Sequence, residues 1–179
     1  MHKSFILGFG VIGALACGQA NAFDTYLTLG VANNFGDLET KKDSIIEQSG
    51  VSYNVGLGAT LNKNFAIELF YTRFGSDTGQ NKDINFNVNQ QGYGLSLNYR
   101  KPIYNDIYVL GSVGAQQLEF RETLFEAENL KVKYSDKTDI NVTYGAGVGY
   151  RVTSNVNFEV KYSRFDKMNT VGGTFIYRF

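Results

Sequence analysis

The chain has 179 residues, which is the size of a single domain. Lys and Arg together number 17, as do Asp and Glu, so the charge balance gives no indication of nucleic acid or another polyanion as a partner. Aromatic residues make up 15% of the chain, which also has 20 glycines, a single proline and a mean hydropathy of -0.21. This composition excludes a bundle of membrane helices and is typical of a β-barrel.

Residues 1–22 have the features of a secretory signal peptide. Lys3 supplies a positive charge, and an apolar run follows from Phe5 to Ala16. A run of about a dozen residues is too short to cross a bilayer as a helix. Residues 20–22 read Ala-Asn-Ala, the pattern of small residues that precedes a signal-peptidase cut. We therefore predict cleavage before Phe23.

The only Cys and the only His of the chain, Cys17 and His2, lie within this segment. The stretch from Leu15 to Gly18 faintly resembles a lipoprotein processing site, but Ala14 stands where such sites carry a larger aliphatic residue. We favour the interpretation that Cys17 belongs to a discarded leader. The mature chain would then contain neither residue, and no disulfide would stabilise it.

After the leader, apolar and polar residues alternate in eight runs, as expected for half-buried strands. The runs cover residues 23–32, 51–61, 65–74, 84–100, 106–120, 139–150, 156–163 and 171–179. Long polar connections at 33–50, 75–83 and 121–137 alternate with short turns at 62–64, 101–105 and 151–155, and a moderate loop covers 166–170. This alternation is typical of an outer-membrane barrel, which has short periplasmic turns and longer outer loops.

The two faces of the runs differ in chemistry. The sixth run has Ile140, Val142 and Tyr144 on one face, and Asn141 and Thr143 on the other. In a soluble carrier of the lipocalin type the apolar face points inward. Here the second face is small and polar, which suits the narrow interior of eight strands. We therefore predict an all-β, eight-stranded antiparallel up-and-down transmembrane β-barrel over residues 23–179, with the soluble carrier as the weaker alternative.

Three stretches resemble a known family: the Gly-rich segment from Tyr144 to Tyr150, the segment from Glu68 to Tyr71, and the final strand that ends in Phe179. With the export signal and eight runs, the chain resembles the small outer-membrane barrels. These are the barrel domain of outer-membrane protein A and the outer-membrane protein X, Opa and Ail-like group. The resemblance covers essentially all of residues 23–179.

The resemblance implies a place in the bacterial outer membrane, with both termini in the periplasm. It also implies that the alternating Phe175, Tyr177 and Phe179 form the recognition signal for the barrel-assembly machinery. Outer-membrane protein A has a peptidoglycan-binding domain after its barrel, and the sequence up to Phe179 has no counterpart. A tether to the cell wall is therefore not expected.

Alternation places five charged residues inside the barrel: Glu68, Asp139, Glu159, Lys161 and Arg178. A buried charge without a partner is costly, so we predict a network in which Glu68 and Glu159 meet Lys161 or Arg178. Such a network either gates a small pore or fills and stiffens the interior. The narrow interior of an eight-stranded barrel favours the filled lumen.

Segments 33–50 and 121–137 are the candidate contact regions for a host or envelope surface partner. Alternation at 130–134 predicts that the fifth and sixth runs extend beyond the membrane as a hairpin, joined by the fourth through Phe86 and Val88. An exposed edge of that sheet could accept a partner strand, and the alternative is a polar loop that only shields the barrel rim. Mixed loop charges do not indicate a patch for heparin-like chains or nucleic acid.

Some enzymes of the outer membrane are also small barrels, namely lipid A deacylase, lipid A palmitoyltransferase and the omptin proteases. The chemistry of those families uses a His as the proton acceptor. The mature chain is expected to lack His and Cys and has no Gly-x-Ser-x-Gly elbow, so we predict no enzymatic activity and no cofactor or metal. The predicted function is support of envelope integrity or adhesion at the surface, among outer-membrane lipid and lipopolysaccharide. A narrow gated channel is the alternative.

Overall fold

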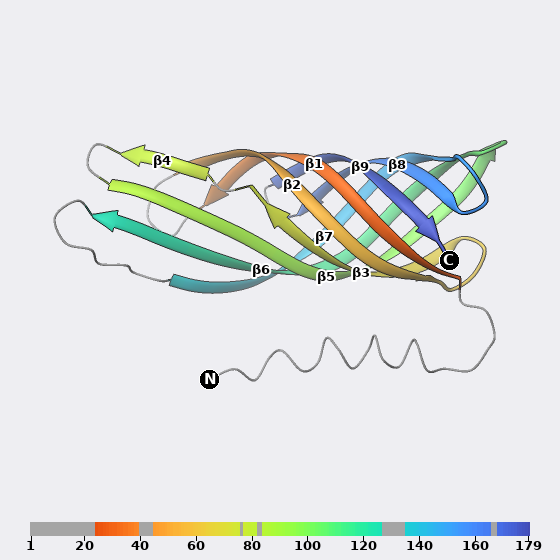
Figure 1. The fold of residues 1–179 in the computed structure, drawn as a ribbon, viewed down its shortest axis with the longest axis horizontal. Helices are drawn as coiled ribbons and strands as arrows, with labels where there is room; N and C mark the ends of the chain where they lie inside the picture. Colours follow the sequence, from red (N-terminus) through yellow and green to blue (C-terminus); the bar gives the residue numbers. More distant parts are fainter. Residues whose placement is uncertain (1–23, 40–44, 76, 82–83, 127–134, 166–167) are drawn as a thin grey trace, which may run out of the picture.

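The computed structural model describes residues 24–39, 45–75, 77–81, 84–126, 135–165 and 168–179. Strands within them are β1 (Thr25–Glu39), β2 (Ile45–Thr60), β3 (Phe65–Phe74), β4 (Asp77–Asn81), β5 (Ile84–Tyr104), β6 (Ile107–Glu126), β7 (Ser135–Arg151), β8 (Val156–Phe165) and β9 (Met168–Arg178). Figure 1 shows them wound around one long axis, with β4, β5 and β6 reaching furthest from the barrel. No helix in the described ranges is long and apolar enough to cross a membrane.

Eight of the strands close into an antiparallel barrel. Strands β1 and β9 pair from Tyr26 opposite Arg178 to Gly36 opposite Met168, which joins the first strand to the last. Strand β3 pairs with β5, and the short β4 lies along the same edge of β5 further from the barrel. The predicted eight-stranded barrel is confirmed, including its closure, and β4 is an additional strand outside the ring.

The wall of the barrel is apolar outside and mostly polar inside. Val142 and Phe175 are exposed, whereas Asn157 and Thr28 are buried in the lumen. This arrangement is the reverse of a carrier that holds an apolar ligand in its lumen, so the soluble-carrier alternative is wrong.

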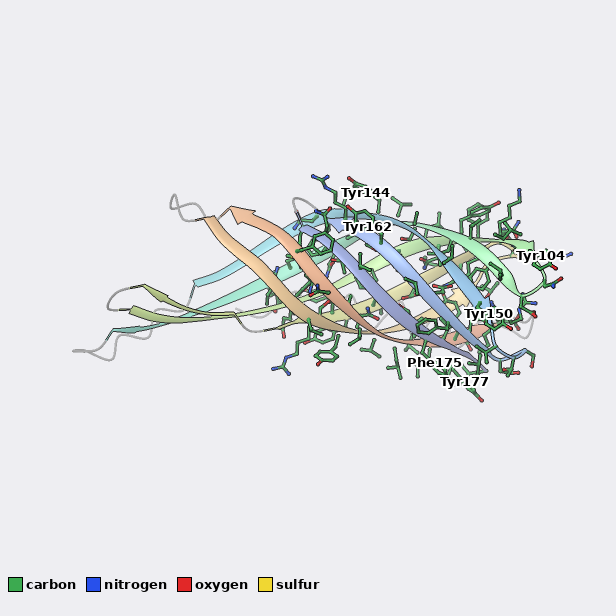
Figure 2. All side chains as sticks on the ribbon, turned by 90° about the horizontal axis from the view of Figure 1, so that it is seen from above. Tyr104, Tyr144, Tyr150, Tyr162, Phe175 and Tyr177 are labelled. Atoms are coloured by element: carbon green, nitrogen blue, oxygen red, sulfur yellow. The ribbon has the colours of Figure 1, made fainter. Side chains whose placement is uncertain are left out.

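Outward aromatic side chains gather at two levels along the barrel (Figure 2). Tyr144 and Tyr162 lie toward the end that carries β4, whereas Tyr150, Phe175 and Tyr177 lie toward the short turns. Two belts of this kind are typical of a membrane-spanning wall, in which aromatic rings sit at both interfaces.

Three connections that the sequence predicted as loops are largely strand. Strands β1 and β2 pair through segment 33–50 as far as Glu39 opposite Ile45, and β4 occupies part of segment 75–83. Segment 121–137 contributes to β6 and β7. The prediction was wrong because strands pair through their backbones, and that pairing does not need the apolar alternation by which strands are identified in a sequence.

The predicted extension of the fourth to sixth runs is confirmed in its backbone pairing. Phe86 pairs with Leu124 and Val88 with Glu122, while β4 pairs with β5 on the other side. We call residues 77–81, 84–88 and 122–126 the distal sheet. The predicted alternation at 130–134 lies outside the described residues, as do residues 40–44 and 82–83.

At the opposite end of the barrel the turns are short, as predicted. Strand β5 continues through most of the predicted turn 101–105, as far as Tyr104, and β6 begins at Ile107. The pairing of the two strands becomes irregular after Pro102. Asn105 then takes a φ of 45°, a left-handed conformation that Asn tolerates better than most residues.

Candidate functional site

An ion pair crosses the lumen near the short turns and joins β5 to β8. Arg100 Nε donates to Glu159 Oε1 at 2.6 Å, and Arg100 Nη2 lies 3.5 Å from Glu159 Oε2. Tyr108 Oη, from β6, donates to the same Oε1 at 2.9 Å. Glu159 is only 5% exposed, so these donors replace the water that its carboxylate would otherwise bind.

A second carboxylate, Glu68 on β3, is held by neutral donors. Tyr26 Oη lies 3.3 Å from Oε2, Thr28 Oγ1 donates to Oε1 at 3.2 Å, and Asn98 Nδ2 lies 3.5 Å from Oε2. Arg100 Nη1 donates to Tyr26 Oη at 3.4 Å, and the guanidinium carbon lies 5.2 Å from the centre of the Tyr26 ring. Arg100 therefore links the two carboxylate clusters into one layer, which we call the polar layer.

Glu68, Glu159 and Lys161 line the lumen, but their pairing differs from the predicted network. Glu159 meets Arg100, not Lys161 or Arg178. Lys161 and Glu68 line the same internal cavity, and among the described residues Lys161 has no ion pair within 4 Å. Arg178 Nη2 is 3.3 Å from the carboxamide oxygen of Asn157 when that group is turned to accept. The backbone of Asp139 pairs with Leu118, and its side chain lies outside the described residues.

Three residues of the polar layer were missed from the sequence: Arg100, Tyr26 and Tyr108. Arg100 continues the inward phase of Ser96 and Asn98, but its place before a predicted turn concealed it. The two tyrosines stand opposite glycines, Tyr26 opposite Gly58 and Tyr108 opposite Gly149. A Cβ on either glycine would collide with the ring of the facing tyrosine. The glycine on the neighbouring strand was therefore the feature of the sequence that could have indicated each inward tyrosine.

Apolar side chains pack together toward the other end of the lumen. Phe74, Leu118, Phe165 and Met168 form a buried cluster in which the two phenylalanine rings are 5.6 Å apart and inclined by 52°. We call this cluster the apolar layer. Between the two layers lies a cavity of about 110 Å³, which has room for water beside Glu68 and Lys161.

The end of the closing strand points its aromatic residues outward. Phe175, Tyr177 and Phe179 are all exposed, and the rings of Tyr177 and Phe179 meet edge to face at 5.5 Å. The backbone N–H of Phe179 donates to the carbonyl of Thr25 at 3.1 Å. These residues thus form a continuous outward face where the barrel closes.

The described residues contain no group of three or more His, Cys, Asp or Glu that could hold a metal ion. The polar layer places carboxylates against arginine and tyrosine, an arrangement that satisfies buried charges. Its chemistry is hydrogen bonding and charge neutralisation within the lumen.

Comparison with known proteins gives a consistent result. The family model for the outer membrane protein beta-barrel domain matches residues 4–179. No curated protein matches the sequence significantly. Among solved structures, Neisserial surface protein A is similar with a TM-score of 0.60 and 17% identity, covering 87% of this chain and 97% of that one.

Two further structures have the same fold. The N-terminal barrel of Pseudomonas aeruginosa OprF is similar with a TM-score of 0.59 and 11% identity, over 88% of this chain and all (100%) of that one. The Yersinia pestis protein Ail is similar with a TM-score of 0.56 and 12% identity, over 88% of this chain and 99% of that one. At these identities the likeness is one of fold.

Proposed function

Because the chain belongs to the outer membrane protein beta-barrel domain family, we propose that it is a non-enzymatic barrel of the bacterial outer membrane that presents its distal sheet to surface partners. In this proposal residues 1–22 are a cleaved export signal. The short turns and both termini face the periplasm, and the distal sheet faces the exterior. Phe175, Tyr177 and Phe179 present the signal for the barrel-assembly machinery.

The length of the strands supports this proposal best. A tilted strand of about 9–11 residues is enough to cross the hydrocarbon core. Strand β5 has 21 residues, β6 has 20 and β7 has 17, so each is long enough to continue well past a membrane. A sheet that extends beyond the lipid is not needed to span it. We therefore assign to the distal sheet the role of contact with other molecules.

The distal sheet also has a backbone edge that suits a partner strand. Strand β4 pairs with β5 alone among the described strands, so its other edge is not used within the described part of the barrel. An unpaired edge binds an extended segment through main-chain hydrogen bonds, which makes strand addition the favoured mode of contact. Ail is named an attachment invasion locus protein, which gives one example of surface contact by a barrel of this fold.

Support of envelope integrity is a second candidate, and the closed lumen favours it. The polar layer and the apolar layer occupy successive levels of the barrel interior. A barrel filled in this way adds a stiff wall to the membrane without opening it. The same two layers count against a conducting channel.

Adhesion and integrity are separated by removing the distal sheet while the barrel is kept. The variant deletes 77–88 and replaces 122–135 with the two-residue turn Asn-Gly, which connects Arg121 to Asp136, its present pairing partner. Cells that express it are compared with wild-type cells for attachment to epithelial cells and for resistance to detergent. A heat-modifiable band on gels verifies that the barrel has assembled.

We expect attachment to be lost and detergent resistance to be kept. Loss of resistance with unchanged attachment would instead assign the function to the barrel wall. If the shortened and wild-type proteins support equal attachment, or if neither does, the distal sheet is not the contact surface.

A further inference from the structure

Two strand edges remain free beyond the closed ring of the barrel, one on β4 and one on β7. Among the described strands, β4 pairs only with β5, over Asp77–Asn81. Strand β7 pairs with β8 only from Thr143 onward, so its edge from Ser135 to Val142 is unpaired on that side within the described part of the chain. Each edge presents backbone N–H and C=O groups to which a further strand can be added.

The edge of β4 lies further from the barrel than the edge of β7. Ser135, the first residue of β7, stands opposite Glu122, which in turn stands opposite Val88. Strand β4 begins opposite that same Val88 and continues outward as far as Asn81, opposite Ile84. Figure 1 shows β4 beside the outer end of β5. A molecule that approaches along the barrel axis from this end therefore meets the edge of β4 before that of β7.

The two edges also differ in their residues. Natural edge strands are protected against pairing by charged residues, above all Lys, and by Pro or bulges. The unpaired stretch of β7 contains Asp136, Lys137 and Asp139. Strand β4 reads Asp-Thr-Gly-Gln-Asn from 77 to 81, with neither Lys nor Pro, and its register with β5 is regular. The edge of β4 thus lacks the features that prevent the addition of another strand.

The sequence of β4 is compatible with pairing to itself. In an antiparallel pair centred on Gly79, position 78 of one copy stands opposite position 80 of the other, and Asp77 stands opposite Asn81. No like charges are then directly opposite, and the centre of the pair has no side chain. Two copies paired in this way are related by a two-fold axis, which is the commonest symmetry of protein dimers.

The direction of β4 decides where the second copy must lie. Strand β5 runs toward the short turns, and β4 is antiparallel to it, so β4 runs away from the barrel. Two copies in one membrane point their β4 strands the same way, which excludes an antiparallel pair. Two copies in facing membranes point these strands in opposite directions, as antiparallel pairing requires.

We propose that β4 is a homophilic contact, which pairs antiparallel with β4 of a second copy of this chain in a facing membrane. This inference rests on the proposed function, because it names a partner for the distal sheet. Strand β4 has 5 residues, so a single pair forms only a short ladder. Many copies on each surface act together and hold the two membranes through avidity.

Docking of vesicles that contain the full chain provides the test. The chain is assembled in phosphatidylcholine vesicles with either a green or a red lipid dye, and particles that show both colours are counted in about 0.15 M salt. Barrels that insert with the distal sheet outward are sufficient, so mixed orientation does not prevent docking. A heat-modifiable band on gels verifies that each barrel has assembled.

Three variants are compared with wild type. The lysine variant has Thr78→Lys and Gln80→Lys, and the glutamate variant has Thr78→Glu and Gln80→Glu. The matched control has Asn85→Lys and Asn87→Lys. These positions on β5 stand opposite 80 and 78, so the control adds the same charge one strand away from the edge.

We expect wild-type vesicles to dock with one another and not with empty vesicles. Two lysine populations should dock about fivefold less, because like charges stand directly opposite at positions 78 and 80, and two glutamate populations should behave likewise. A mixture of lysine and glutamate vesicles should dock again, since the facing charges are then opposite. The control should dock as wild type does, because its charges lie about three strand spacings apart, which is beyond the Debye length.

Two results would overturn the proposal. Equal docking of wild-type vesicles with empty ones would show that the partner is lipid. Undiminished docking of the lysine variant, or a mixture that docks no better than the lysine variant alone, would show that β4 does not pair with β4. The comparison with empty vesicles needs no substitution, so it stands even if a variant fails to assemble.

The vesicles contain no epithelial surface, so this result is independent of the attachment experiment. Docking without epithelial attachment would leave the homophilic contact standing and remove the host surface as a partner. Attachment without docking would instead assign the distal sheet to a partner other than a second copy.

Discussion

Arg100 is the residue on which the polar layer depends. Its guanidinium pairs with Glu159 at 2.6 Å and also contacts Tyr26. Removal of Arg100 therefore leaves the buried Glu159 carboxylate with Tyr108 as its remaining donor among the described residues. Breaking a buried ion pair by removing one partner typically costs about 3–5 kcal/mol. We therefore predict that Arg100→Ala lowers the free energy of unfolding by about that amount, measured by urea titration in lipid vesicles.

Arg178→Ala is the matched control. The backbone N–H of Arg178 on β9 donates to the short turn before β8, just as that of Arg100 on β5 donates to the short turn before β3. The side-chain partner of Arg178 is a neutral carboxamide, so the loss should be smaller, about 1 kcal/mol. The double variant Arg100→Met with Glu159→Leu should recover much of the stability, since no charge is left unpaired. Equal losses for the two single alanine variants would contradict this account of the layer.

For a single residue, period-two alternation predicts which side of the barrel wall its side chain faces but not which residue it pairs with. Glu68 and Glu159 lie inside because each continues a small polar face. Which cation reaches Glu159 depends on the stagger between β5 and β8, strands that are not neighbours in the ring. That stagger is set by the closure of the whole barrel, which a pattern within one run does not contain.

Single strands show where sequence patterns succeed and where they fail. Strand β3 has the predicted bounds, Phe65–Phe74, because a tight turn precedes it and Gly75 follows it. Strands β1 and β2 continue far into the segment predicted as a loop. Inside a membrane one face must be apolar, so alternation marks a strand; outside it that requirement disappears and the signal with it.

The last strand carries a prediction about assembly. Phe175, Tyr177 and Phe179 form an outward aromatic face at the closing edge, which is the proposed assembly signal. Deletion of Phe179 is expected to slow membrane insertion in cells at least several-fold while leaving the other pairings of the barrel available. Pulse-chase labelling, with the heat-modifiable form as the readout, measures that rate.

Tyr99→Ala gives the control for that experiment. Tyr99 directly precedes Arg100, as Tyr177 directly precedes Arg178, and the centres of the Tyr99 and Phe65 rings are 5.0 Å apart. Tyr99 lies on β5, away from the closing edge. The Tyr99→Ala variant should insert at the normal rate even if its folded barrel is less stable than that of the wild type. Normal insertion of the Phe179 deletion would show that the aromatic face is not the signal.

For the molecule as a whole, the two layers in the lumen act in series. The polar layer blocks the end near the short turns with Arg100 and Glu159, and the apolar layer blocks the other end with Phe74 and Phe165. The cavity between them has room for water but is bounded by both. An ion that crosses the barrel would have to pass the charged side chains of the polar layer and the packed rings of the apolar layer.

We therefore predict that the wild-type barrel carries no steady current in planar bilayers. Alanine replacement of Phe74 and Phe165 should leave it closed, because the polar layer still fills the lumen. Replacement of Arg100 and Glu159 should also leave it closed, because the side chains of the apolar layer still fill the other end of the lumen. Only the variant with all four replacements is expected to conduct, so steady current through the wild type or through either double variant would show that the layers do not act in series.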